Sequence, residues 1–133
     1  MKTMAVMLAA MMACSTVPDA NQSAPSTVGG VALTAEATGS EVRLKLTNQS
    51  AEPVGYNLCS SRLVRRSGDT WTNVPTGVMC TMEIRTLAAG ASDTFTHTLP
   101  STAAAGEYRY ETRVEMPMGG PGTHVASNSF EVK

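Results

Sequence analysis

The chain of 133 residues has few aromatic side chains, few histidines and no excess of either charge. Phe, Trp and Tyr together make up 5% of the residues, and there are two histidines. Ten basic side chains are balanced by eleven acidic ones, so the formal net charge is −1. A protein without a basic excess lacks the main electrostatic means of binding a phosphate backbone, so no nucleic-acid partner is expected.

The sequence also lacks a hydrophobic run long enough to cross a bilayer. The apolar segment at residues 4–13 is too short, because a membrane-spanning helix needs roughly 20 residues. It follows Lys2 and ends with the small residue Ala13, which is the arrangement of a secretory signal peptide. We therefore expect the protein to be exported.

Residues 11–14, Met-Met-Ala-Cys, resemble a bacterial lipobox, the processing signal of envelope lipoproteins. The resemblance implies that residues 1–13 are a signal peptide and that Cys14 carries lipid, including a palmitate-like acyl chain, so that the membrane is a partner through this anchor. Ser15 follows the cysteine where an Asp would retain the protein in the inner membrane, so the expected location is the outer membrane, facing the periplasm or the exterior. The alternative is an unmodified thiol beside an ordinary cleavage site.

The segment after Cys14 has the composition of a linker. Residues 15–27 consist mostly of Ser, Thr, Ala, Asn and Pro, and a segment this polar cannot form a hydrophobic core. We expect residues 14–27 to be a lipidated N-terminus and flexible tether, and residues 28–133 to form one domain, which we expect to be monomeric.

From residue 28 onward, apolar and polar residues alternate in short segments that are separated by Gly, Pro, Asn or Ser. A period of two predicts β-strands. The segments are residues 31–35, 42–47, 54–59, 62–66, 70–74, 92–99, 106–116 and 125–132, with residues 81–86 ambiguous. Seven or eight short strands without a convincing helix predict an all-β protein folded as an antiparallel β-sandwich.

The alternation also predicts which side chains are buried. The expected core contains Val31, Leu33, Val42, Leu44, Leu46, Tyr56, Leu58, Trp71, Phe95, Tyr108, Tyr110, Val114, Phe130 and Val132. In segment 106–116 the other face carries alternating Glu and Arg, from Glu107 to Glu115, and is expected to be exposed to solvent.

The sequence has three cysteines, one near the N-terminus and two within the predicted domain. If Cys14 carries lipid, Cys59 and Cys80 remain as a pair in an oxidising compartment, where a disulfide is the expected use. Two buried, reduced thiols are the alternative.

Several short motifs resemble the immunoglobulin-like domains of bacterial envelope lipoproteins. They are residues 46–48 (Leu-Thr-Asn), 53–59 (Pro-Val-Gly-Tyr-Asn-Leu-Cys), 68–71 (Gly-Asp-Thr-Trp), 87–90 (Leu-Ala-Ala-Gly), 99–100 (Leu-Pro), 106–110 (Gly-Glu-Tyr-Arg-Tyr) and 129–132 (Ser-Phe-Glu-Val). The resemblance covers about residues 31–133 and implies an immunoglobulin-like sandwich. In it, Cys59 and Cys80 would tie the end of one strand to the loop beyond the next hairpin, and Tyr108 resembles the tyrosine-corner residue.

Motifs of catalysis are not found in the sequence. There is no nucleophile elbow, zinc-protease motif or phosphate-binding loop, so we expect no enzyme, catalytic residue, resident metal or cofactor. His97 alternates with Phe95 and Leu99, which indicates a partly buried structural histidine.

The candidate binding loop is residues 116–124. Met116, Pro117 and Met118 can form an adaptable apolar contact for a protein or polysaccharide, at a position that antibody-like domains use for recognition. Two other interpretations stay open: Met116, Met118 and His124 as ligands of Cu(I), or a plain Gly/Pro-rich hairpin. A looser resemblance to another bacterial immunoglobulin-like group implies proteinase inhibition as a further alternative. The hypothesis from sequence is a lipid-anchored, non-catalytic binding or structural module of the cell envelope.

Overall fold

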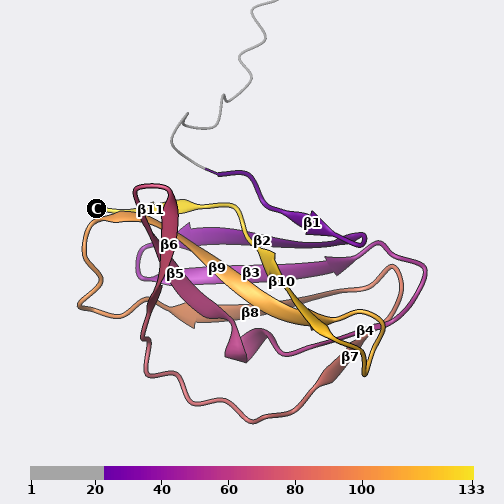
Figure 1. Cartoon of the computed structure of the whole chain (residues 1–133). Coiled ribbons are helices and arrows are strands. Elements are labelled where there is room, and N and C mark those ends of the chain that lie inside the picture. Colours follow the sequence, from indigo (N-terminus) through magenta and orange to yellow (C-terminus); the bar gives the residue numbers. More distant parts are fainter. Residues whose placement is uncertain (1–22) are drawn as a thin grey trace, which may run out of the picture.

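The computed structural model describes residues 23–133. This part of the chain contains eleven strands and one short 3-10 helix, and all strand pairs are antiparallel. The strands form a four-stranded and a seven-stranded sheet that pack face to face (Figure 1). The predicted antiparallel β-sandwich is confirmed.

The four-stranded sheet has the order β1-β2-β3-β8. Its strands are β1 (Thr27–Val28), β2 (Val31–Thr38), β3 (Glu41–Asn48) and β8 (Ser92–Thr98). The side chains of β3 show why the sequence folds this way: Val42, Leu44 and Leu46 are fully buried, whereas the charged residues between them are exposed. Alternation along the strand therefore separates an inner, apolar face from an outer, charged one.

The seven-stranded sheet is built around its longest strand, β9. Its strands are β4 (Val54–Tyr56), β5 (Arg62–Ser67), β6 (Thr70–Val74), β7 (Arg85–Leu87), β9 (Gly106–Glu115), β10 (Gly122–Ala126) and β11 (Phe130–Val132), with the 3-10 helix η1 (Leu58–Ser60) between β4 and β5. Strands β5 and β4 pair in turn along one side of β9, and β11 and β10 pair along the other. Strand β6 then pairs with β5 and β7 pairs with β4, so β6 and β7 form one edge of this sheet, and β10 and β11 form the other.

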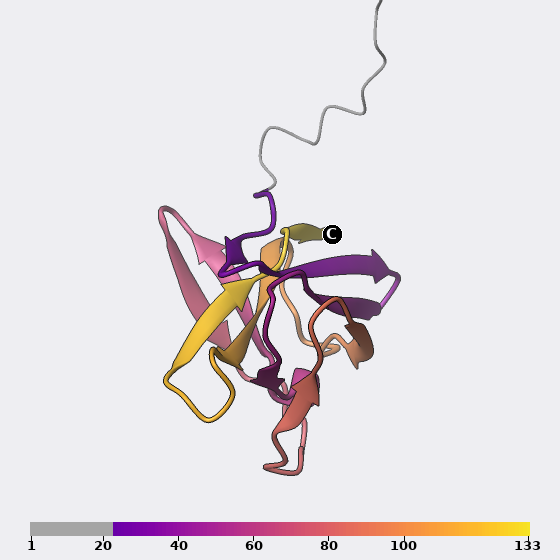
Figure 2. The same cartoon turned by 90° about the vertical axis from the view of Figure 1, so that its right-hand side faces the viewer.

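The connections between the two sheets follow a Greek key. Strands β2, β3 and β8 lie in one sheet, and β5, β9 and β10 lie in the facing sheet (Figure 2). The chain thus enters the second sheet after β3, returns for β8 and crosses again for β9. Immunoglobulin-like sandwiches distribute their first, second and fifth strands and their third, sixth and seventh strands in this way.

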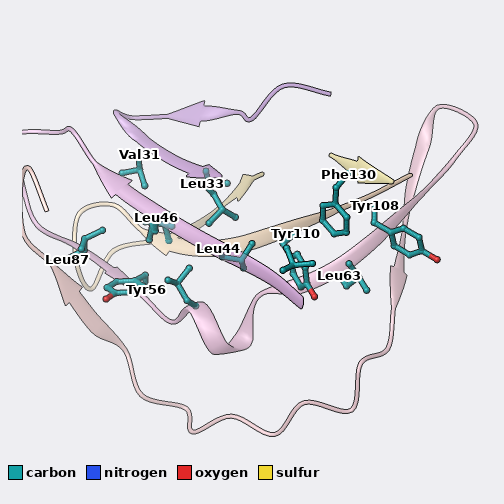
Figure 3. Packing of buried hydrophobic residues seen from close by; sticks show 14 of the residues in the cluster. Val31, Leu33, Leu44, Leu46, Tyr56, Leu63, Leu87, Tyr108, Tyr110 and Phe130 are labelled. Atoms are coloured by element: carbon teal, nitrogen blue, oxygen red, sulfur yellow. The ribbon is translucent and has the colours of Figure 1, made fainter. Parts of the chain in front are cut away.

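The core lies between the two inner faces. Leu33, Leu44 and Leu46 of one sheet pack toward Tyr56 and Tyr110 of the other (Figure 3). Most of the predicted core residues are buried, and Val54, Leu63, Leu87, Leu99 and Val125 join them.

The prediction that Trp71 lies in the core is wrong. Trp71 pairs with Arg66, and Arg109 pairs with Val64, which places both side chains on the outer face of the seven-stranded sheet. The guanidinium carbon of Arg109 lies 4.2 Å from the centre of the Trp71 ring, so the indole is partly covered by a cation.

The prediction of a fully exposed charged face on β9 is also wrong at Glu111, which is 8% exposed. Its carboxylate forms ion pairs with Arg62 at 2.6 Å and with Arg109 at 2.8 Å. Burial opposes ionisation, but these two arginines hold the pKa of Glu111 below its usual range. Arg62 comes from β5 and Arg109 from β9 itself, and the side chain is buried because β5 and β10 flank Glu111 on both sides.

Two further predicted core residues lie at the margins of the sandwich. Phe95 remains 36% exposed because β8 is the last strand of its sheet, and no neighbouring strand covers that side. Val132 is partly buried, since it is the last residue of the short strand β11.

The predicted last strand is divided into β10 and β11 by residues 127–129. Asn128 leaves the sheet here, and its side-chain amide pairs with β2: Oδ1 accepts from Ala35 N at 2.8 Å, and Nδ2 donates to Ala35 O at 2.9 Å. The Asn128 side chain thus forms hydrogen bonds to β2 at the point where its own backbone bends out of the sheet.

Ordered pairing begins before residue 28, where the sequence places the start of the domain. Ser23 N donates to Ser129 Oγ at 2.6 Å, and Ser26 N donates to Ala126 O at 3.0 Å. Residues 23–27 therefore run along the last two strands of the fold.

The resemblance of Tyr108 to a tyrosine corner is matched by its geometry. The Tyr108 hydroxyl donates to the Ala104 carbonyl oxygen at 2.5 Å, and the ring is 1% exposed. The bond ties the start of β9 to the loop before it, which contains no helix, as expected.

Asn48, at the end of β3, is a fully buried polar residue whose side chain is saturated with hydrogen bonds. Its Nδ2 donates to the carbonyl oxygens of Glu52 at 2.8 Å and of Leu87 at 3.1 Å, while Oδ1 accepts from Ser50 N at 3.0 Å. Its backbone N–H donates to Ala91 O, and its carbonyl accepts from Gly90 N. One residue therefore fixes the turn after β3, the end of β7 and the entry into β8.

Replacing Asn48 with Ala should lower the free energy of unfolding by about 2–4 kcal/mol, because the buried Leu87 carbonyl loses its donor and a cavity remains. Chemical denaturation followed by circular dichroism measures the change. Asn73→Ala, at an exposed position of β6, is the matched control and should change stability by less than about 0.5 kcal/mol. Equal effects of the two substitutions would contradict the role given to Asn48.

Candidate recognition surface

The predicted pair Cys59 and Cys80 forms a disulfide, with a Cα–Cα distance of 5.8 Å. Cys59 lies in η1, directly after β4, and Cys80 lies in the segment of residues 75–84 between β6 and β7. The bond thus joins the end of one strand to the loop beyond the next hairpin, as the sequence resemblance implies. We refer to residues 75–84 as the Cys80 loop.

Asn57 holds the same loop from a second direction. Its Oδ1 caps η1 by accepting from Cys59 N at 3.1 Å, and its Nδ2 donates to the Thr81 carbonyl at 2.8 Å. The sequence analysis missed this residue. The signal was present, because Asn two residues before a backbone N–H commonly forms such a side-chain turn.

The Cys80 loop carries most of the large apolar side chains that are exposed in the described part of the chain. Met79 and Met82 are each 95% exposed, and Val78 and Ile84 are also exposed. None of the backbone–backbone hydrogen bonds found outside the regular elements of residues 23–133 involves this loop. It is an extended, apolar segment that is held by a disulfide and an asparagine side chain.

A groove of about 270 Å³ separates the end of the Cys80 loop from β8. Thr81, Glu83 and Arg85 form one wall, and residues 93–95 form the other. On its floor, the Tyr56 hydroxyl donates to Asp93 Oδ2 at 2.5 Å. Burial and this bond to a carboxylate raise the pKa of Tyr56 to about 12, so the hydroxyl remains a proton donor at neutral pH.

His97 is a buried structural histidine, as the alternation in its strand indicates. Its Nε2 lies 2.9 Å from the Leu58 carbonyl oxygen, and its ring stacks on Tyr110 with centroids 4.8 Å apart. Burial lowers the pKa of His97, so the ring is neutral at pH 7.

The side chains of the predicted binding loop lie in different environments. Met116 packs against the core, Met118 is exposed, and the exposed His124 lies within β10. The Met118 sulfur accepts from Thr86 Oγ1 of β7 at 3.1 Å. The peptide bond between Met116 and Pro117 is cis. Copper binding by these side chains stays a prediction.

Between residues 23 and 133 there is no group of three or more His, Cys, Asp or Glu side chains placed to hold a metal ion. The same part of the chain has no helix that is long and apolar enough to cross a membrane. Cys14, the predicted lipid attachment site, lies outside the described residues.

The chain matches no protein-family model, no curated protein and no solved structure among those compared with it. The resemblance to immunoglobulin-like domains of envelope lipoproteins therefore stays an expectation from the sequence, and the function must be argued from the structure.

The buried His97 should make stability depend on pH. Because its pKa in the folded protein lies below the usual 6.5, the unfolded chain takes up a proton first, and the free energy of unfolding should fall as the pH drops below that value. The slope of the free energy of unfolding against pH should not exceed about 1.4 kcal/mol per pH unit, and this slope should disappear in His97→Phe. Urea denaturation between about pH 7 and pH 5.5 measures it, above the range where carboxylates contribute.

The control for this measurement is His124→Gln, which alters the exposed histidine and should keep the slope. A slope that persists in His97→Phe would show that another group is responsible.

Proposed function

We propose that the protein is an exported, lipid-anchored, non-catalytic binding module of the cell envelope, and that the Cys80 loop is its recognition surface. The observation that carries this proposal is the exposure of Met79 and Met82 on a segment that a disulfide holds in place. Exposed apolar side chains gathered on one segment are typical of interaction sites.

The position of the loop supports the proposal. The first described residues and the C-terminus lie on one side of the sandwich, and the Cys80 loop lies on the opposite side (Figures 1 and 2). If Cys14 holds the chain at a membrane, the loop lies on the side of the domain opposite the end at which the chain leads to that anchor, and it is accessible to another component of the envelope.

The way the loop is held supports recognition of a protein. The disulfide at Cys80 and the hydrogen bond from Asn57 to Thr81 reduce the number of conformations that the loop can adopt before binding. Such preorganisation lowers the entropy cost of association. Met79 and Met82 add flexible, polarisable side chains that adapt to an apolar cavity of a partner.

Proteinase inhibition is a second candidate, and it would use the same loop. An extended segment that forms none of the backbone–backbone hydrogen bonds found outside regular elements can offer most of its N–H and C=O groups to a cleft that binds extended peptides. The covalent tie at Cys80 would keep the segment in that form.

A photoreactive amino acid placed at Met82 should crosslink the protein to a partner in intact cells, because this side chain is almost fully exposed on the proposed surface. The same label at Glu36, on the outer face of β2, should give no discrete product. An excess of purified chain should suppress the product, whereas Met79→Asp/Met82→Asp should not, since the charged side chains cannot enter an apolar cavity. Gel shifts and mass spectrometry identify the product.

A label at Met118 distinguishes the alternatives. Crosslinking from Met118 and not from Met82 would move recognition to the loop of residues 116–124 and overturn the present proposal. A peptidase captured from Met82 would favour the inhibitor function, which an activity assay of that peptidase with the purified chain then decides.

Lipid anchoring predicts that Cys14→Ser will release the protein from membranes. The wild-type chain should incorporate labelled palmitate and sediment with membranes, because two or three acyl chains anchor a protein stably. The variant should incorporate none and appear in the soluble fraction. Membrane association that is unchanged in Cys14→Ser would contradict the anchor.

A further inference from the structure

Strand β8 forms an open edge of the four-stranded sheet. Among the described residues it pairs only with β3, and it is the terminal strand in the sheet order (Figure 1). Its seven residues have the sequence Ser-Asp-Thr-Phe-Thr-His-Thr. An edge strand often carries lysines, prolines, bulges or inward-pointing charges that prevent pairing with another chain. Strand β8 has no lysine, proline or bulge, and its one inward-pointing charge, Asp93, is bonded to Tyr56 of the facing sheet.

The register of the sheet shows which backbone groups of β8 point away from β3. Asn48 N donates to Ala91 O, and Leu99 N donates to Ser40 O, so the hydrogen-bonded pairs between the two strands involve the odd-numbered residues of 91–99. In an antiparallel ladder the residues between them direct their N–H and C=O groups to the other side. Ser92, Thr94, Thr96 and Thr98 therefore present these groups at the open edge.

Two observations at this edge fit a missing partner strand. The Thr94 N–H is capped by Asp93 Oδ1 at 2.8 Å, so a side chain occupies the place of a neighbouring carbonyl. Phe95, the middle residue of β8, remains 36% exposed. The groove beside residues 93–95 shows that the Cys80 loop does not cover this part of the edge.

We propose that β8 pairs antiparallel with β8 of a second copy of the chain, about a two-fold axis that passes beside Phe95. This register aligns all seven residues of the strand. Phe95 then lies opposite Phe95 of the second copy, Thr94 opposite Thr96, Asp93 opposite His97, and Ser92 opposite Thr98.

The sequence of β8 suits this register because it is nearly palindromic. Hydroxyl side chains meet hydroxyl side chains on the outer face, where Thr–Thr pairs are favourable, and no two like charges face each other. The two Phe95 rings form the central pair. That pair is not hydrogen-bonded, so its side chains approach more closely and cover each other's exposed surface.

The other edge strands are less suitable for a second copy. Within the described residues, strand β10 pairs only with β9, but Ser26 already bonds to the N–H and the carbonyl oxygen of Ala126 at its end. Strand β1 has two residues, and β7 has three, of which one is Arg85. Strand β6 contains Trp71, whose ring is already engaged by Arg109. The sequence alone suggests a monomer, whereas the open edge of β8 favours a symmetric dimer. This inference is independent of the Cys80 loop and its partner.

Like charges introduced at Thr94 and Thr96 test the register. In Thr94→Glu/Thr96→Glu the new carboxylates lie beside Lys45 and Arg43 within the chain, but face each other across the proposed axis. We expect the dissociation constant of the dimer to rise at least about tenfold. Sedimentation equilibrium of the full chain, purified as cells produce it and in density-matched detergent, measures this constant.

The matched control is Thr94→Glu/Thr96→Lys, which places opposite charges across the axis and should leave the constant within about threefold of wild type. Thermal melting of each variant shows that the fold is retained. A wild-type chain with the mass of one copy over its whole soluble range would overturn the proposal, and so would equal weakening by the two double variants.

Discussion

The hydrogen bonds of Asn48 are the constraint on which both functional surfaces depend. Its side chain belongs to β3 in one sheet but donates to Leu87 of β7 in the other, so it ties the two sheets together at one end of the sandwich. Its backbone fixes Gly90 and Ala91, directly before β8. The Cys80 loop leads into β7, and the open edge begins at Ser92, so a single buried amide sets where each of them lies.

The alternation of apolar and polar residues was sufficient to predict the strands and most of the core, because it is a local property. It predicted Val42, Leu44 and Leu46 correctly. It failed where burial depends on neighbouring strands: Trp71 lies partly buried on the outer face, Glu111 is buried on that face, and Arg109 contacts both. Phe95 has the correct orientation but lacks a strand beside it, which no pattern within β8 reveals.

The candidate site divides in the same way. The disulfide prediction followed from the number of cysteines and from the export that the pattern of residues 1–14 leads us to expect, both of which are local features of the sequence. The exposure of Met79 and Met82 could not be predicted from the sequence, because an apolar side chain in an irregular segment is as compatible with a core as with a surface. Only the path of the Cys80 loop shows that these side chains point outward. Met116 shows the reverse, since a methionine expected at the surface packs against the core.

The shortness of β1 has a consequence for how far assembly can proceed. When two copies join through β8, the far edge of the combined sheet on each side consists of β1 and of the part of β2 that β1 does not cover. Strand β1 pairs only with Val31 and Ala32, and the Asn128 side chain occupies the N–H and C=O of Ala35, so few backbone groups remain to recruit a third copy. An isologous contact uses the same patch on each copy and is complete once made. The fold thus has one sheet edge that can pair with a second copy and an opposite edge that cannot. In the proposed dimer, a strand sequence that could support fibre formation is limited to a closed pair.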